Sequence, residues 1–310
     1  MKAVVATLGL AILPVGSLFA AEPTAGRFRA DANVVLINAT VLDRQDHPVR
    51  GLSRDQFRLF EDKMEQSIAY FSEEEAPVSV AVIFDTSGSM GRKTSPMRAA
   101  LDAVLRSANN EDEFSLITFA DGPQITSGWT RSTEEIQNRL LFEVPRGQTA
   151  LLDAIHTGLR YLKHAKNSRR AMVIFSDGGD NHSRRTESEV RRSLEEADVE
   201  IYALNAVDLL PSRSRAAEEM AGPRLLDRLC DRAGGRYFEV DSRRDMDLAA
   251  EKISHELRSQ YVIGYVPPWS NADGRFHRVR VQIEKSAAKS KLSVFWRRGY
   301  RAPGALAEIR

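Results

Sequence analysis

The sequence contains one cysteine among its 310 residues, and its formal net charge is only +1. The single cysteine, Cys230, excludes an intrachain disulfide, and its helical, apolar surroundings indicate a buried small hydrophobe rather than a reactive thiol. The balanced charge excludes a whole-molecule field that would attract nucleic acid or an acidic partner. Hydrophobic residues make up 42% of the chain, which is enough to bury one substantial core and a smaller second one.

The chain also lacks an uninterrupted apolar run long enough for a convincing membrane-spanning helix. The mostly apolar stretch 3–19 is broken by Pro14 and Gly16. Lys2 precedes this stretch and small residues end it, which is typical of a secretory signal peptide over residues 1–21. We therefore expect an exported protein, associated with a membrane only if this segment stays uncleaved.

Several motifs typical of enzymes are incomplete. The segment Ser254-His255-Glu256 lacks the second histidine of a zinc-protease helix. Residues 88–93 have the wrong spacing for a phosphate-binding loop, and Ser87 stands where a nucleophile elbow requires glycine. We therefore expect the protein not to be an enzyme.

A polar loop directly follows a segment typical of a buried strand. The run from Val78 to Phe84 is mostly apolar, as in a central parallel strand covered on both faces. Asp85, Ser87 and Ser89 follow it, and residues two apart can point the same way in an extended loop. Their oxygens could converge on a hard cation such as Mg²⁺, although Asp and Ser are equally common as turn formers and helix caps.

Two further segments supply oxygen donors near the expected ends of other elements. Thr149 precedes a helical pattern, where it can also serve simply as an N-cap. Asp177 follows a second buried strand, and Gly178 and Gly179 then permit a tight turn. Since ligands of open α/β sheets lie outside the carboxyl ends of the strands, both residues are expected beside the Asp85 loop.

With these three segments together, the sequence resembles a von Willebrand factor type A domain that carries a metal-ion-dependent adhesion site. The resemblance assigns metal binding to five residues, Asp85, Ser87, Ser89, Thr149 and Asp177. It covers Val78 to Arg258 and implies an α/β fold with a doubly wound, mostly parallel sheet. The alternation of strand and helix patterns along the same span predicts that fold independently.

Alternating strand-like segments flank this span on both sides. They are Asn33–Asp43, Val49–Leu52, Phe57–Glu61 and Gln66–Phe71 before it, and Tyr261–Val266, Phe276–Ile283 and Leu292–Arg298 after it. An isolated hairpin is marginal in water, so we expect the two flanks to pair in one small β-sandwich-like module into which the α/β domain is inserted. The flanks also resemble a bacterial group of secreted proteins related to this domain, on patterns such as Gly51–Phe57 and Gly264–Pro267.

The resulting organisation is a signal peptide over 1–21, an N-terminal β module over 22–75, the type A domain over 76–259 and C-terminal strands over 260–310. Helices are expected over 96–109, 132–142, 149–165, 186–197, 223–233 and 245–258. Ser132 with Glu135 and Thr186 with Glu189 match the capping-box pattern. The polar, arginine-rich segment 208–222 is expected to be a long loop, mobile or facing a partner.

The resemblance implies recognition of a protein rather than turnover of a substrate. The metal would be Mg²⁺, with Mn²⁺ or Ca²⁺ as alternatives, and few protein carboxylates would leave it electron-poor and able to accept an Asp or Glu from a partner protein. The arginines at 184, 185, 191 and 192 form either a solvated face or a patch that steers such a partner. The location expected is secreted or periplasmic, in the bacterial envelope. Two alternatives remain: a scaffold or sensor subunit of an envelope complex with a structural metal, and a metal-assisted hydrolase.

Overall fold

The structure, a computed structural model, describes residues 34–206, 217–267, 273–284 and 291–302. The expected signal peptide and most of the expected 208–222 loop lie outside these residues. Within them, no helix combines the length and the apolar character needed to cross a membrane.

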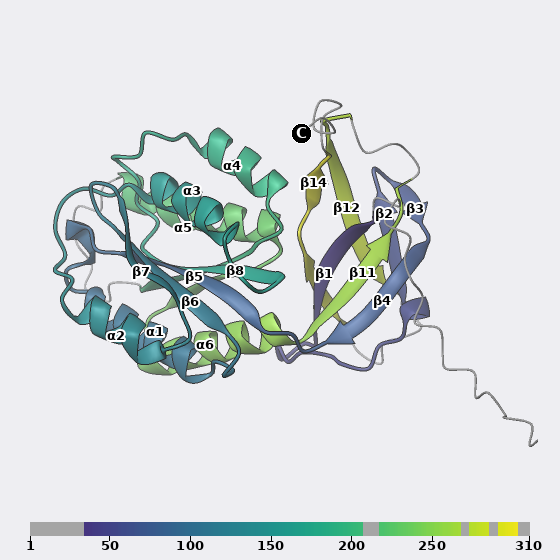
Figure 1. Ribbon diagram of the computed structural model, residues 1–310, viewed down its shortest axis with the longest axis horizontal. Helices are drawn as coiled ribbons and strands as arrows, with labels where there is room; N and C mark the ends of the chain where they lie inside the picture. Colours follow the sequence, from purple (N-terminus) through teal and green to yellow (C-terminus); the bar gives the residue numbers. More distant parts are fainter. Residues whose placement is uncertain (1–33, 207–216, 268–272, 285–290, 303–310) are drawn as a thin grey trace, which may run out of the picture. The chain divides into compact units, whose positions relative to one another are not determined.

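A six-stranded, mostly parallel sheet forms the centre of the α/β part (Figure 1). Its strand order is β10-β9-β8-β5-β6-β7, and only β7 runs antiparallel to its neighbour. The strands are β5 (Val78–Asp85), β6 (Glu113–Phe119), β7 (Pro123–Thr130), β8 (Arg169–Phe175), β9 (Glu200–Ala206) and β10 (Tyr237–Val240). Strand β5 pairs in parallel with β6 on one side and with β8 on the other, so the strand order reverses at β5 and the sheet is doubly wound, as predicted.

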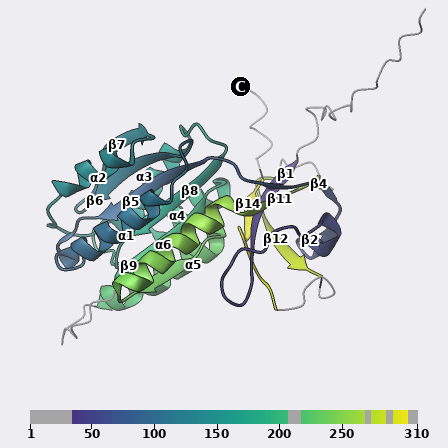
Figure 2. The same cartoon turned by 90° about the horizontal axis from the view of Figure 1, so that it is seen from below.

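Helices cover both faces of this sheet. One face carries α1 (Thr94–Arg106), α2 (Thr133–Leu141) and α6 (Arg243–Arg258); the other carries α3 (Leu151–Leu162), α4 (Glu187–Glu196) and α5 (Ala217–Ala233). Helices α1 and α6 lie side by side, which Figure 2 shows from below. Strand β5 is buried along its whole length because Val80 and Val82 pack toward α1 and α6 while Ala81 and Ile83 pack toward α3.

Two four-stranded antiparallel sheets form the β module. Their orders are β13-β1-β11-β4 and β14-β12-β2-β3. The strands are β1 (Val35–Leu42), β2 (Phe57–Glu61), β3 (Met64–Gln66), β4 (Ile68–Glu74), β11 (Gln260–Tyr265), β12 (Phe276–Ile283), β13 (Ser293–Trp296) and β14 (Gly299–Arg301). Both sheets therefore combine strands from before and after the α/β part, which alternate in the first sheet and meet at the β12–β2 pair in the second. The two sheets share one apolar core. This confirms the predicted sandwich of paired flanks.

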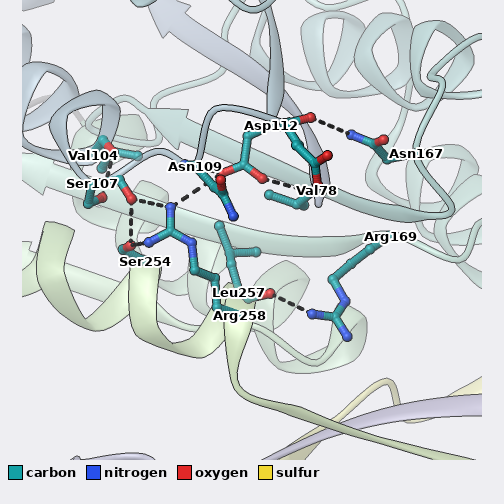
Figure 3. A network of polar contacts seen from close by, with 11 residues as sticks. Val78, Val104, Ser107, Asn109, Asp112, Asn167, Arg169, Ser254, Leu257 and Arg258 are labelled. Atoms are coloured by element: carbon teal, nitrogen blue, oxygen red, sulfur yellow. Dashed lines mark hydrogen bonds and ion pairs between the residues drawn. The ribbon is translucent and has the colours of Figure 1, made fainter. Parts of the chain in front are cut away.

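The points where the chain enters and leaves the α/β part are held together by Asp112 (Figure 3). The backbone N–H of Val78, at the start of β5, donates to Asp112 Oδ1 at 2.9 Å. Arg258, at the end of α6, lies with Nη2 3.3 Å from Asp112 Oδ2. Asp112 is 3% exposed and Arg258 is 29% exposed, so this partly buried pair fixes the two chain segments next to each other.

Both predicted capping residues begin their helices. Thr186 and Glu189 form the full reciprocal box at the start of α4. At α2, Ser132 accepts the Glu135 N–H at 3.2 Å, but the Glu135 carboxylate accepts a hydrogen bond from the hydroxyl of Ser127 at 2.8 Å. The side chain thus links the helix to β7 instead of completing the box.

Three elements differ from the predictions. The segment Val49–Leu52 is not a strand, because Gly51 has a φ of +74°, outside the range of extended backbone. Helix α5 begins at Ala217, within the segment that was predicted to be loop, and Pro223 lies inside it. The expected strand Leu292–Arg298 is shortened to β13, and an additional strand that was not predicted, β14, follows it in the other antiparallel sheet.

Candidate functional site

The candidate site begins where two neighbouring parallel strands end. Phe84 of β5 lies beside Phe175 of β8, so Asp85 and Ser176 follow at the same edge of the sheet. The Ser176 hydroxyl donates to Asp85 Oδ2 at 2.6 Å. Burial raises the pKa of Asp85 to about 6; hydrogen bonds from Ser176 and Ser87 oppose this rise, and the negative charge of Asp177 adds to it. Asp85 is therefore a desolvated carboxylate, stabilised by any cation that reaches it.

The loop after β5 brings two serine hydroxyls together. The Ser87 N–H donates to Asp85 Oδ1 at 2.9 Å, and a short 3-10 turn over Gly88–Met90 follows. This turn places Ser87 Oγ and Ser89 Oγ 3.1 Å apart. Ser87 is fully buried whereas Ser89 is exposed. The sequence prediction that alternate residues of this loop point the same way is thus confirmed for the two serines.

Thr149 lies in a second loop, joined to the first by backbone. The Gly88 N–H donates to the carbonyl of Gly147 at 3.1 Å. The Thr149 N–H donates to Asn181 Oδ1 at 2.9 Å, and its carbonyl accepts the N–H groups of Asn181 and His182, both at 3.0 Å. Thr149 is buried, so its place between these two loops is fixed by contacts on both sides.

The expectation that Thr149 opens a helix is wrong. Helix α3 begins at Leu151, and Ala150 occupies the N-cap position. The free N–H groups of the first turn are instead capped from the loop after β8: Asp180 Oδ1 accepts the Leu152 N–H at 3.3 Å, and Ser183 Oγ accepts the Asp153 N–H at 3.1 Å. Thr149 is consequently not needed as a helix cap.

Asp177 follows β8 and is the most constrained member of the set. Its Oδ1 accepts the Gly179 N–H at 3.2 Å. Gly178 has a φ of +81°, and a Cβ atom at this position would lie 2.5 Å from the backbone of Gly222 in α5. Only glycine fits this contact, which confirms the predicted tight turn.

Lys93 is a member of the site that, like Ser176, was not predicted from the sequence. Its Nζ lies 2.8 Å from Asp177 Oδ2, and the two side chains are only 15% and 5% exposed. Lys93 immediately precedes α1, so the 3-10 turn that positions Ser89 also directs this ammonium group into the site. A lysine within the same loop as Asp85 was the one available signal. Asp177 therefore already has a positive partner.

The arginine patch lies beside the site on an anchored loop. The backbone N–H groups of Arg184 and Arg185 donate to the two carboxylate oxygens of Asp153, at 3.0 and 2.9 Å. Arg185 also pairs with Glu189 at 3.7 Å on the exposed surface of α4. The loop is held in place while both guanidinium groups remain exposed to solvent.

Comparison with known proteins identifies the fold of this part of the chain. Residues 80–179 match the family model described as von Willebrand factor type A domain. A comparison with curated proteins finds no match. The matched residues include all five candidate metal ligands.

Solved structures that are similar to parts of this chain share little sequence with it. A von Willebrand factor type A protein from Catenulispora acidiphila aligns over 90% of this chain and 76% of its own, with a TM-score of 0.50 and 10% identity. BatB from Bacteroides thetaiotaomicron aligns over 59% of this chain and 100% of its own, with a TM-score of 0.46 and 19% identity. The von Willebrand domain of the type V pili tip protein Mfa5 from Porphyromonas gingivalis aligns over 58% and 94%, with a TM-score of 0.46 and 11% identity. From its sheet topology and its family match, this chain contains a von Willebrand factor type A domain.

Proposed function

We propose that the protein is a metal-dependent protein-binding module of the bacterial envelope. Asp85, Ser87, Ser89, Thr149 and Asp177 would hold Mg²⁺, or Mn²⁺ or Ca²⁺ in its place, directly or through water. When bound, the metal would supply an electron-poor cation that accepts a carboxylate oxygen. The partner would be a protein that offers an Asp or Glu side chain.

The observation that carries this proposal is the pair of serine hydroxyls beside a buried carboxylate. Adjacent ligands of an octahedral Mg²⁺ lie about 2.9 Å apart, because each bond is about 2.0–2.1 Å long. The separation of 3.1 Å between Ser87 Oγ and Ser89 Oγ is close to this spacing. Asp85 supplies the negative charge, and the exposure of Ser89 leaves one side of the set open to a partner.

The donor set favours binding over catalysis. Hydroxyl groups neutralise little of a cation's charge, so an added carboxylate would strengthen the complex considerably. Hydrolysis would require a positioned general base near the cation. His182, the nearest histidine in the sequence, contributes its backbone N–H to Thr149. We therefore propose a recognition role without turnover.

A second candidate function is supported by the ion pair between Lys93 and Asp177. The ammonium group already compensates one of the two carboxylates, so the loops could keep their arrangement without strong metal binding. In that case the chain would be a scaffold or sensor subunit of an envelope complex. The location in either case, secreted or periplasmic, rests on the signal-like residues 1–21.

The decisive experiment measures partner capture with and without divalent metal. The immobilised protein is incubated with envelope extract in Mg²⁺ or in EDTA, and the captured partner is then titrated against Asp85→Ala and Thr149→Ala. Loss of a central interface contact costs about 2 kcal/mol or more, which is a loss of affinity of about thirtyfold. Asp102→Ala is the matched control, since this aspartate lies on α1 and pairs with Gln137.

Metal-dependent recognition requires that affinity falls in EDTA and in both site variants, while Asp102→Ala binds as the wild type does. Binding that is indifferent to EDTA and to Asp85→Ala would instead support the scaffold function.

A further inference from the structure

We propose that Glu61, Asp62 and His277 form a second metal site, which binds a divalent transition metal such as Zn²⁺. The site lies in the β module and is separate from the Asp85 loops. Glu61 ends β2, Asp62 belongs to the turn between β2 and β3, and His277 lies in β12. Strands β2 and β12 are hydrogen-bonded neighbours, so the site crosses from the N-terminal to the C-terminal flank.

The three potential ligand atoms are already close together. His277 Nδ1 lies 3.0 Å from Glu61 Oε1 and 2.9 Å from Asp62 Oδ2, and all three atoms lie within 4.8 Å of one another. Two ligands of a tetrahedral zinc lie about 3.3 Å apart, since each bond is about 2.0–2.2 Å long. The two separations from His277 Nδ1 therefore need to widen by only a few tenths of an ångström.

An unusual backbone conformation brings the two carboxylates to one point. Consecutive residues of a strand normally point to opposite faces of the sheet. Asp62 and Lys63, however, have φ angles of +46° and +75° and form a two-residue turn between Glu61 and Met64. The turn returns the Asp62 side chain to the face that Glu61 occupies.

The surroundings of His277 match those of a metal-binding histidine. Its second nitrogen, Nε2, lies 3.2 Å from Asp273 Oδ1. Ligating histidines almost always donate this second N–H to a carboxylate, a carbonyl or water, which fixes the tautomer and the ring orientation. Tyr300 stacks on the imidazole at 5.5 Å and donates its hydroxyl to Glu61 Oε1 at 3.2 Å. Both ligands are therefore oriented by further side chains.

The buried carboxylate of Glu61 is the independent sign of a missing ligand. Its side chain is 1% exposed, and Oε2 makes no hydrogen bond of ordinary geometry with any described residue, although the Tyr265 hydroxyl is close enough to interact with this carboxylate. An unpaired carboxylate oxygen in a dry environment is costly, and a metal ion would compensate it. Asp62 is 45% exposed, so this side of the cluster is open to solvent and to an entering ion.

The ligand types select the class of metal. An imidazole nitrogen suits Zn²⁺ and similar transition metals, whereas Mg²⁺ prefers oxygen ligands throughout. A proton on His277 is the competing occupant: burial opposes it, but hydrogen bonds to Asp273 and Asp62 outweigh burial and raise the pKa of the imidazole. A bound metal would be coordinated by His277 Nδ1, whereas a proton would make Nδ1 a hydrogen-bond donor to the carboxylates.

The test titrates the metal-free full chain with Co²⁺, followed by displacement with Zn²⁺. Cobalt bound by imidazole and carboxylates at low coordination number absorbs visible light far more strongly than aqueous Co²⁺. Asp62→Asn should weaken Co²⁺ binding at least tenfold. Asparagine keeps an oxygen for the Arg278 N–H, which Asp62 Oδ1 accepts at 2.9 Å, and it tolerates a positive φ, so the turn is preserved.

The matched control is Asp43→Asn, which removes an aspartate from another turn that also contains a histidine, His47. This control and Asp85→Ala should both retain the cobalt spectrum. A second readout, the ¹⁵N resonance of His277 Nδ1, should shift on addition of Zn²⁺ in the wild-type protein. Unchanged cobalt binding in Asp62→Asn, or a His277 resonance indifferent to saturating Zn²⁺, would overturn the proposal and leave His277 as a protonated ion-pair partner only.

Discussion

The two polar clusters, one in the α/β part and one in the β module, neutralise a buried carboxylate in different ways. Asp177 has the ammonium group of Lys93 at 2.8 Å, and Glu61 has the imidazole of His277 at 3.0 Å. An ammonium group has no lone pair at neutral pH and cannot bind a metal. An imidazole can lose its proton and become a ligand.

This difference determines what a metal must do in each cluster. At the Asp85 cluster a bound metal would compete with Lys93, which would have to release Asp177 or remain beside a second cation. At the Glu61 cluster the residue that supplies the positive charge would itself join the coordination. The first arrangement suits weak, exchangeable binding that a partner carboxylate strengthens, whereas the second suits a resident ion that ties strands together.

The largest effect is expected from removal of the C-terminal flank, which takes His277 away from the Glu61 cluster and leaves the Asp85 cluster complete. Deleting residues 260–310 removes β11 from between β1 and β4, removes β13 from the edge of the same sheet, and removes β12 and β14 from beside β2 in the other sheet. The remaining N-terminal strands would expose their apolar faces, so we expect an insoluble protein. Solubility and size-exclusion chromatography measure the outcome. A monodisperse truncated protein would contradict the shared core of the two flanks.

Metal specificity is expected to divide between the clusters. Saturating Mg²⁺ at about one hundred times its dissociation constant should stabilise the wild-type fold by about 2.7 kcal/mol. Asp85→Ala should abolish this shift in melting temperature but retain the shift caused by Zn²⁺. Asp62→Asn should show the reverse. If one variant lost both shifts, the two clusters would not be independent.

Replacing Lys93 should strengthen metal binding at the Asp85 cluster. Lys93→Met removes the competing ammonium group, and we expect affinity for Mg²⁺ to rise about tenfold, or about 1.4 kcal/mol. Isothermal titration calorimetry measures the change. Arg92→Met, which removes a positive charge from the same turn, is the control and should bind as the wild type does. A weaker affinity in Lys93→Met would indicate that Lys93 supports the site.

The smallest effect is expected from the arginine patch. Replacing Arg184 and Arg185 by alanine should slow association with an acidic partner by about tenfold at most, with little change in dissociation. The reason is that exposed charges at the rim of an interface act mainly on the encounter. Surface plasmon resonance at several salt concentrations tests this, because the variant should also lose part of the salt dependence. An unchanged association rate would mean that the arginines are a solvated face.

Much of the fold of the α/β part could be predicted from the sequence because its strands and helices have local sequence patterns. Buried strands read as apolar runs, and the residues that follow them meet at one edge of a parallel sheet. That rule was sufficient to predict that Asp85 and Asp177 lie near each other. The role of Ser176 as a donor to Asp85 was missed, since serine after a strand has many uses.

Contacts between side chains that are far apart in the sequence could not be predicted from the sequence. His277 follows Asp62 by 215 positions, and their contact depends on the register between β2 and β12 and on the positive φ of Asp62. Neither feature has a signature in the local pattern. Lys93 was missed for a similar reason: the direction of its side chain depends on the 3-10 turn that precedes α1.

The pairing of β4 with β11 also sets the order in which the chain can fold. Glu74 and Gln260 face each other across these two strands, so the whole α/β part replaces what would otherwise be a hairpin turn. The α/β part has its own core and can fold before β4 and β11 pair. Its folding then brings the ends of these two strands close together. The entropic contribution to the free energy of closing a loop grows only slowly, by about 0.6 kcal/mol for each doubling of the loop length. The α/β part would thus be the early-forming unit, and the antiparallel sheets would complete the fold last, after synthesis of the C-terminal strands.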